Sequence, residues 1–318
     1  PHVSIEEEGS RSPLLVVLGG RTARSIRNID MGADVEVLVM DTDARTERNF
    51  PQMNVVTIGS RIVQGEGSGG NMNLARACFR LDMDRIAPLV LGRPLVVLLA
   101  STEGATGIAG AVEVSSLLTT VGMSCFSFLL HEDNVKGAGV DPLRIASTLL
   151  DGPLRPGCII VGGQSPCSSP EEPFGLRPVL PLILQSASNS RGLPAPQSTW
   201  AVLREDGGPF SVGLLSIPSN PSRTDISPPA LVSLRVPEGM TNMEVRSRLG
   251  SAFPDPEGIH FAIITSGETK EMEGAFISKS HLKTVPPDRE PIDPGTLKEL
   301  LGDPDSINIE PSIKIMGG

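Results

Sequence analysis

Short, fully apolar runs alternate with amphipathic stretches through the first half of the chain. Leu14–Leu18 is apolar at every position, and so is 95–100. Such runs are typical of strands in a parallel sheet that is covered on both faces. The same reading predicts further strands at 35–40, 55–58, 123–130 and 158–161, with helices at 21–29, 74–91 and 110–120. This alternation predicts an α/β protein with a doubly wound parallel sheet.

Proline separates the two halves of the chain. All but six of the 29 prolines lie beyond residue 150. Because proline breaks helices and central strands, the second half should consist of short elements joined by loops. Its apolar pattern predicts strands at 200–203, 210–217, 230–236, 259–265 and 274–280, and helices at 242–249 and 296–301. This part should form a smaller mixed α/β domain.

The composition of the chain argues against several classes of function. The formal charge is −10 and aromatic residues are 3% of the chain, which argues against a nucleic-acid partner. The apolar runs are too short for membrane insertion, and the acidic, polar start at 1–12 predicts no signal peptide. The four cysteines show no CxxC pair, and a reducing, cytoplasmic location is expected (Cys78, Cys125, Cys158, Cys167).

Three glycine-containing loops follow predicted strands, where ligands of such sheets bind. Gly19 and Gly20 end the first strand. The loop 65–71 reads GEGSGGN, and 101–110 reads STEGATGIAG. Glycines let backbone N–H groups approach a phosphate closely, and a following helix adds partial positive charge. The alternatives are an ordinary Gly-Gly turn, a flexible surface loop and a strand–helix turn capped by Thr106.

Other chemistry is not signalled by motif. Walker A, GxGxxG after the first strand, HExxH, GxSxG and EF-hand patterns are missing from the sequence. The scattered histidines and the cysteines fit surface or core positions, so no metal held by protein ligands is predicted.

The loops and their order resemble the FtsZ/tubulin family of nucleotide-dependent filament proteins. GEGSGGN (65–71) resembles the family loop G-x-G-A-G-G-N, and ATG (105–107) takes the place of the signature G-G-G-T-G-[TS]-G. The segment 41–44, DTDA, resembles N-T-D-A after the second strand, and 18–28 resembles the first glycine loop and its helix. The match spans about 13–165.

The resemblance implies GTP or GDP as ligand and self-association, or association with a related FtsZ-like subunit. It implies nucleotide contacts from these loops: Gly19, Gly20, Asp43, Gly67, Ser68, Gly69, Gly70, Asn71, Gly104, Thr106 and Gly107. It also implies an N-terminal tail, a GTPase-like domain, a central helix region, a second α/β domain and a C-terminal linker, at 1–12, 13–170, 171–193, 194–285 and 286–318.

Departures from the family pattern predict a degraded pocket. Family glycines are replaced by Arg21, Thr22, Glu103, Ala105 and Ala109. A carboxylate beside phosphate costs Coulomb energy, and we expect the carboxylates of Glu66 and Glu103 to face the phosphates. Arg21 and Arg24 either offset this charge or fill the phosphate site themselves.

The sugar-contacting and catalytic positions also differ. Lys136 and Val140 align with the family's ribose-contacting Glu and a following Arg. The stretch 191–206, in place of the N-x-D-x-x-D loop, has no acid before Glu205 and Asp206, which are weak catalytic candidates. Prolines at 178 and 181 should delay or kink the central helix.

We therefore expect an FtsZ/tubulin-like cytoskeletal or cell-division protein that assembles head to tail. Its GTP binding should be weak or lost, and GTP hydrolysis should be absent. Two alternatives stay open at this point: an active GTPase that uses Glu205 or Asp206, and an unrelated doubly wound domain that binds another nucleotide.

Overall fold

The structure is a computed structural model of the whole chain. It describes residues 12–123, 125–132, 142–150, 152–154, 157–161, 174–188, 210–218, 226, 228, 230–254, 257, 259–266, 269–279 and 293–302.

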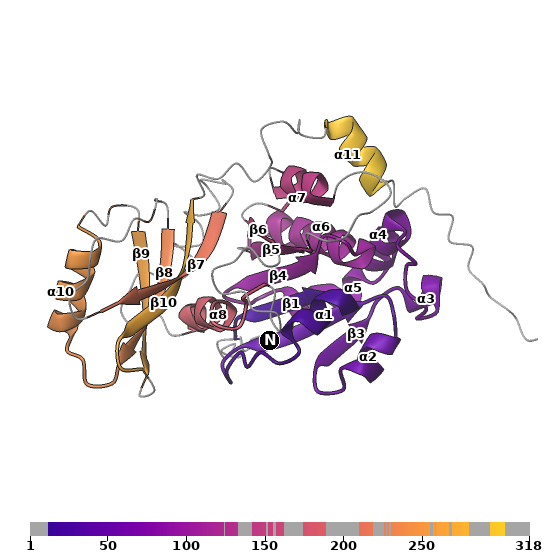
Figure 1. The fold of residues 1–318 in the computed structure, drawn as a ribbon. Coiled ribbons are helices and arrows are strands. Elements are labelled where there is room, and N and C mark those ends of the chain that lie inside the picture. Colours follow the sequence, from indigo (N-terminus) through magenta and orange to yellow (C-terminus); the bar gives the residue numbers. More distant parts are fainter. Residues whose placement is uncertain are drawn as a thin grey trace, which may run out of the picture.

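The first sheet has six parallel strands (Figure 1). Its order is β3-β2-β1-β4-β5-β6. The strands are β1 (Leu14–Leu18), β2 (Glu36–Asp41), β3 (Asn54–Thr57), β4 (Val96–Ser101), β5 (Cys125–His131) and β6 (Gly157–Val161). Because the chain winds outward in both directions from the neighbouring strands β1 and β4, the predicted doubly wound sheet is confirmed.

Apolar side chains cover both faces of this sheet. Within β1, Leu15 and Val17 pack into one core, while Leu14, Val16 and Leu18 pack into the other. The first face is covered by α1 (Gly20–Ile26) and α8 (Leu180–Ser188). The second is covered by α4 (Met72–Leu81), α5 (Met83–Val90), α6 (Ala105–Thr120) and α7 (Pro142–Leu150). The uninterrupted apolar runs in the sequence reflect this two-sided burial.

Two helices differ from their predicted bounds. The single helix predicted at 74–91 is split at Asp82, whose carboxylate accepts hydrogen bonds from the Gly59 N–H (2.8 Å) and from Arg85 Nη1 (2.9 Å). The helix predicted at 110–120 begins at Ala105. Residues 105–110, which are most of the third glycine loop, therefore belong to α6. The short helices α2 (Arg45–Asn49) and α3 (Ser60–Val63), and α7, were not predicted.

A second, mixed sheet follows in the chain. Its order is β7-β10-β8-β9, with β8 and β9 parallel and the other pairs antiparallel. The strands are β7 (Phe210–Ile217), β8 (Ala230–Pro237), β9 (Ile259–Ser266) and β10 (Met272–Lys279), and α10 (Asn242–Ala252) packs beside them. This confirms the smaller mixed sheet; the strand predicted at 200–203 lies outside the described residues.

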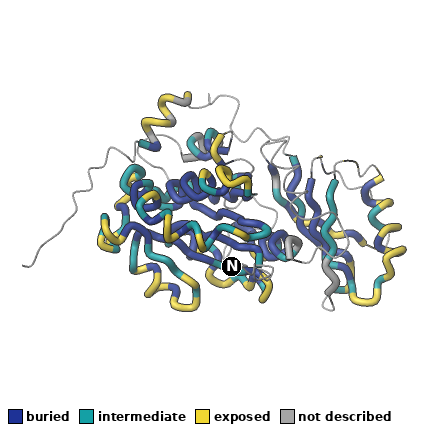
Figure 2. The backbone as a smooth tube through the Cα atoms, turned by 180° about the vertical axis from the view of Figure 1, so that it is seen from behind, coloured by how far each residue is buried: buried dark blue, intermediate teal, exposed yellow. Residues whose placement is uncertain are grey.

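Helix α8 connects the two sheets. It starts late, as its prolines predict: Pro181 is its second residue, a position that tolerates proline. Ser233 Oγ, on β8, donates a hydrogen bond to the Leu182 carbonyl oxygen at 2.7 Å. The rings of Phe126 and Phe210, one from each sheet, lie 6.0 Å apart. The sheets thus share one core, which Figure 2 shows as continuous buried backbone through the centre of the molecule.

The last described helix, α11 (Pro294–Leu301), packs back onto α4. Leu301 is buried in the core of the first sheet, and Arg76 Nη1 donates to the Gly302 carbonyl oxygen at 2.9 Å. A helix was predicted at 296–301, but its return to the first sheet was not. Among the helices in the described ranges, none has the length and apolar character needed to cross a membrane.

Candidate nucleotide site

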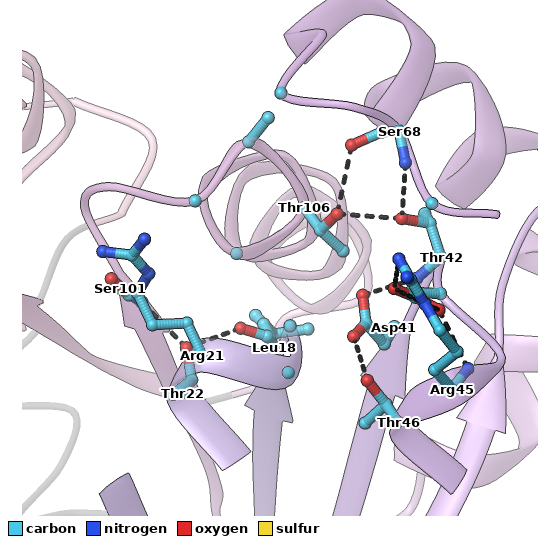
Figure 3. A pocket seen from close by; sticks show the side chains of 18 of the residues that line it. Leu18, Arg21, Thr22, Asp41, Thr42, Arg45, Thr46, Ser68, Ser101 and Thr106 are labelled. Carbon is cyan, nitrogen blue, oxygen red and sulfur yellow. Dashed lines mark hydrogen bonds and ion pairs between the residues drawn. The ribbon is translucent and has the colours of Figure 1, made fainter. Parts of the chain in front are cut away.

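A cavity of about 420 Å³ opens at the carboxyl edge of the first sheet (Figure 3). That volume is within the range of small-molecule sites. The structure brings ten of the eleven predicted contact residues into its lining: Gly19, Gly20, Asp43, Gly67, Ser68, Gly69, Gly70, Gly104, Thr106 and Gly107. Their convergence from separate loops follows from the parallel sheet, whose strands all end at this edge.

Asn71 is the exception among the predicted contacts. It does not line the cavity. Its side chain is the N-cap of α4 and accepts a hydrogen bond from the Leu74 N–H at 3.0 Å. Asn71 therefore caps the helix that leaves the loop, a role that was not predicted from the sequence.

The first loop turns sharply at Gly19. Its φ of 85° lies in a region that favours glycine, and its N–H donates to the Met40 carbonyl oxygen at 2.9 Å. Thr22 then ties the loop to the sheet: its hydroxyl donates to the Leu18 carbonyl oxygen (2.7 Å) and accepts from the Ser101 N–H (3.0 Å). Thr22, in place of a family glycine, therefore holds the first and third loops together.

The end of β2 contributes a buried carboxylate. Asp41 Oδ2 accepts from the Thr46 hydroxyl at 2.6 Å, and Oδ1 accepts from the Thr42 N–H at 2.7 Å. Burial raises the pKa of Asp41, and these hydrogen bonds partly oppose that rise. Its oxygens are thus occupied inside the protein. The only sequence signal for this role was its place at the end of a buried strand.

Three hydroxyl groups join the loop after β2, the 65–71 loop and the 101–110 loop. Thr42 Oγ1 lies 2.9 Å from Thr106 Oγ1 and accepts from the Ser68 N–H at 3.1 Å. Ser68 Oγ lies 3.2 Å from Thr106 Oγ1. Thr42 was not among the predicted contacts. A ligand phosphate could take hydrogen bonds from this cluster by replacing bonds that its members make with one another.

The amino end of α6 points into the cavity (Figure 3). Gly104 is the N-cap, and no side chain caps this end among the described residues. The first N–H groups of a helix lack partners within the helix and carry partial positive charge. Together with the left-handed glycines Gly67, Gly69 and Gly70, they form a cradle suited to a phosphate. The residues present therefore fit an anionic ligand.

The carboxylate of Glu103 does not face the phosphate space as expected. Its side chain is 2% exposed and lies 3.0 Å from His131 Nδ1. Burial raises its pKa, but the Ser101 hydroxyl, the Glu132 N–H and the Thr102 hydroxyl lower it by more, so the pKa lies below its ordinary value. These donors turn the carboxylate inward. Glu103 and Glu66 both line the cavity, but Glu66 is exposed.

Three arginines line the cavity. Arg45 forms a two-pronged ion pair with Asp43, with nitrogen–oxygen distances of 2.7 to 3.0 Å, which lowers the pKa of Asp43. Arg21 and Arg24 lie on α1, at the opposite rim. Both line the cavity, and the two roles predicted for them stay predictions.

Several predicted positions lie outside the described residues. They are Lys136, Val140, Glu205, Asp206 and the stretch 191–206. In the described part, no group of three or more His, Cys, Asp or Glu side chains could hold a metal ion.

No protein-family model matches the chain. The cell division protein FtsZ of Azotobacter vinelandii is 27% identical over 89 residues, which are 28% of this chain and 23% of that protein. The FtsZ dimer of M. jannaschii has a TM-score of 0.61 at 15% identity, covering 86% of this chain and 89% of that one. CetZ2 of Haloferax volcanii, a GTPγS-bound protofilament, has a TM-score of 0.59 at 16% identity, covering 85% and 93%. The chain thus matches about a quarter of the curated relative's length in sequence.

A glycine-lined cleft at the edge of a doubly wound sheet, with one helix leading to a mixed sheet, defines a two-domain α/β fold whose ligands bind at the carboxyl ends of the strands. Its fold is that of FtsZ and tubulin. The sequence similarity to FtsZ, taken with this fold, supports membership of the chain in the FtsZ/tubulin superfamily, as the loops predicted.

Proposed function

We propose that this protein is an FtsZ/tubulin-like cytoskeletal or cell-division protein that assembles head to tail in the cytoplasm. Its partner would be a second copy or a related FtsZ-like subunit. The observation that carries the proposal is the convergence of the three glycine loops and the amino end of α6 on one cleft, within the fold of a superfamily whose solved members include an FtsZ dimer and a CetZ2 protofilament. Head-to-tail contacts give open filaments when their rotation does not close.

Weak or lost GTP binding follows from how the cleft uses its polar groups. Thr42, Ser68 and Thr106 already bond one another, and Arg45 is paired with Asp43. Glu66 leaves a negative charge at the cavity. Much of the binding free energy of a triphosphate is thus offset by broken internal contacts and by repulsion.

Isothermal titration calorimetry with GTP tests this affinity. We expect a dissociation constant well above micromolar. Glu66→Gln should tighten binding severalfold, whereas Glu47→Gln, an exposed acid on α2 outside the cavity lining, should not. A wild-type constant near micromolar, about −8 kcal/mol, would contradict the proposed weak binding.

Turnover is tested separately. Hydrolysis needs both a bound γ-phosphate and a carboxylate that orients water, and each supplies several kcal/mol of barrier lowering. We expect phosphate release at background over the range of protein concentrations that permits assembly, judged by sedimentation and electron microscopy. Release that rises with protein concentration and is lost in Glu205→Ala/Asp206→Ala would favour the active-GTPase alternative.

A further inference from the structure

Two arginines on α1 stand at the rim of the cleft with little to neutralise them. Arg21 and Arg24 are three residues apart, so their side chains are neighbours on one face of the helix. Both line the cavity and both are exposed. Arg21 Nη1 lies 3.8 Å from Glu132 Oε2, a loose pair whose side chains are 46% and 44% exposed. Arg24 forms no ion pair with the described residues.

Apart from Glu66, which lines the cavity and is exposed, the other charged side chains of the cleft are already paired or hydrogen-bonded inside the protein. Arg45 is held by Asp43, and the Asp41 oxygens accept from Thr46 and from the Thr42 N–H. Glu103 is turned inward onto its own donors. Figure 3 shows Arg21 on one side of the Thr106 end of α6 and Arg45 on the other. The positive charge of the cleft that is least neutralised therefore lies on Arg21 and Arg24, on the α1 side.

We infer that the side chains of Arg21 and Arg24 hold the phosphate chain of the ligand in this cleft, in addition to the backbone N–H groups at the start of α6. This rests on the proposed nucleotide pocket and specifies what holds the ligand in it. Guanidinium groups match phosphate oxygens with two parallel hydrogen bonds, so each arginine adds geometry as well as charge. The ligand class is then set by the phosphate chain: triphosphate binds more tightly than diphosphate, and inorganic tripolyphosphate competes with GTP.

Glu132 restrains this interaction. Because its carboxylate shares Arg21 with the ligand, Glu132→Gln frees the guanidinium and tightens tripolyphosphate binding severalfold. In an Arg21→Ala background most of this gain disappears, because the arginine that Glu132 restrains is gone. The pair thus forms a double-mutant cycle that separates release of Arg21 from a general change in charge.

The test is calorimetry with inorganic tripolyphosphate and with GTP, on the full chain, at about 0.01 M and about 1 M salt, where the Debye length falls from about 30 to about 3 Å. Arg21→Ala and Arg24→Ala should each weaken tripolyphosphate binding about tenfold at low salt, which is about 1.4 kcal/mol. High salt should remove most of the difference. Arg21→Lys should restore part of the loss.

Arg27→Ala is the matched control. Arg27 follows α1 directly, is exposed, and does not line the cavity, so its variant should bind like the wild type. Thermal unfolding of each variant checks that the fold is retained. If the double variant Arg21→Ala/Arg24→Ala binds both ligands within twofold of wild type, or if tripolyphosphate fails to displace bound GTP, the inference is wrong while the proposed pocket stands. If neither ligand binds the wild type at low salt, this inference is wrong, whereas lost GTP binding agrees with the proposed function.

Discussion

Gly107→Ala should destabilise the protein, although alanine is the better helix former. Gly107 lies in the first turn of α6, directly against the ends of two strands. An added Cβ would lie 3.1 Å from the Ser101 carbonyl oxygen and 3.2 Å from the Leu18 carbonyl oxygen. Both oxygens belong to backbone at the ends of β4 and β1, which are paired to each other along their lengths, so neither can move alone.

The magnitude is a difference of two terms. Replacing glycine with alanine in a helix gains up to about 1 kcal/mol. Forcing a methyl group into a closely packed site costs about 1–3 kcal/mol. We expect a net loss of up to about 2 kcal/mol, and each kcal/mol lowers the melting temperature of a domain of 150–250 residues by about 2–4 °C. Tripolyphosphate binding should weaken as well, because α6 must shift away from the sheet edge.

Gly250→Ala is the matched control for this prediction. Gly250 is exposed within α10, and an added Cβ would meet nothing within 4 Å. The same substitution there should raise the melting temperature, because the helix-propensity gain is unopposed. Differential scanning calorimetry measures both variants. If Gly107→Ala is as stable as Gly250→Ala, close contact between α6 and the sheet does not explain why glycine stands at 107.

Three further results are expected. Glu113→Ala should lower the free energy of unfolding by about 3 kcal/mol in urea titrations, because it leaves Arg76, 12% exposed, without its ion pair at 2.6 Å. Glu103 has a folded pKa below its ordinary value of 4.5, so it stabilises the fold above that pH and the effect is lost as pH falls through the folded pKa; the stability gap between wild type and Glu103→Gln should therefore narrow in acid. Asp293→Ala removes an N-cap that accepts two backbone N–H groups, and should speed tryptic cleavage at Lys298 in α11.

The parallel sheet could be predicted because its strands carry the signal locally. Runs such as Leu14–Leu18 are apolar at every position, and this is what burial on both faces requires. The first and third glycine loops were found for a similar reason, since they follow such runs directly, whereas the 65–71 loop comes after the short helix α3 and was found by its glycines. Their meeting in one cleft then needed no further information, because parallel strands end at the same edge.

The contacts that shape the cleft depend on residues far apart in sequence. At the split, the Asp82 carboxylate accepts a hydrogen bond from the Gly59 N–H, 23 residues earlier, which the sequence pattern does not show. Glu103 was expected at the phosphates because the sequence shows its charge but not the hydrogen bond that it accepts from the Glu132 N–H, 29 residues later. Thr42 joins the hydroxyl cluster through Thr106, 64 residues away. Each of these is a tertiary contact between residues far apart in the chain, and local sequence patterns do not predict such contacts.

This chain keeps glycine at some positions of the FtsZ/tubulin loops and replaces it at others, and the comparison indicates which property of the cleft differs. Gly19 and Gly107 remain where the backbone needs a positive φ or a close approach to the sheet. The replacements Arg21 and Ala105 lie in the first turns of helices, where any side chain fits, and among the described residues Gln64 alone is a non-glycine with positive φ. The replacements therefore add no backbone strain. They leave the cradle's backbone in place and change its side chains, so we expect any difference in ligand binding from FtsZ to come from charge and hydrogen bonding rather than from a collapsed loop.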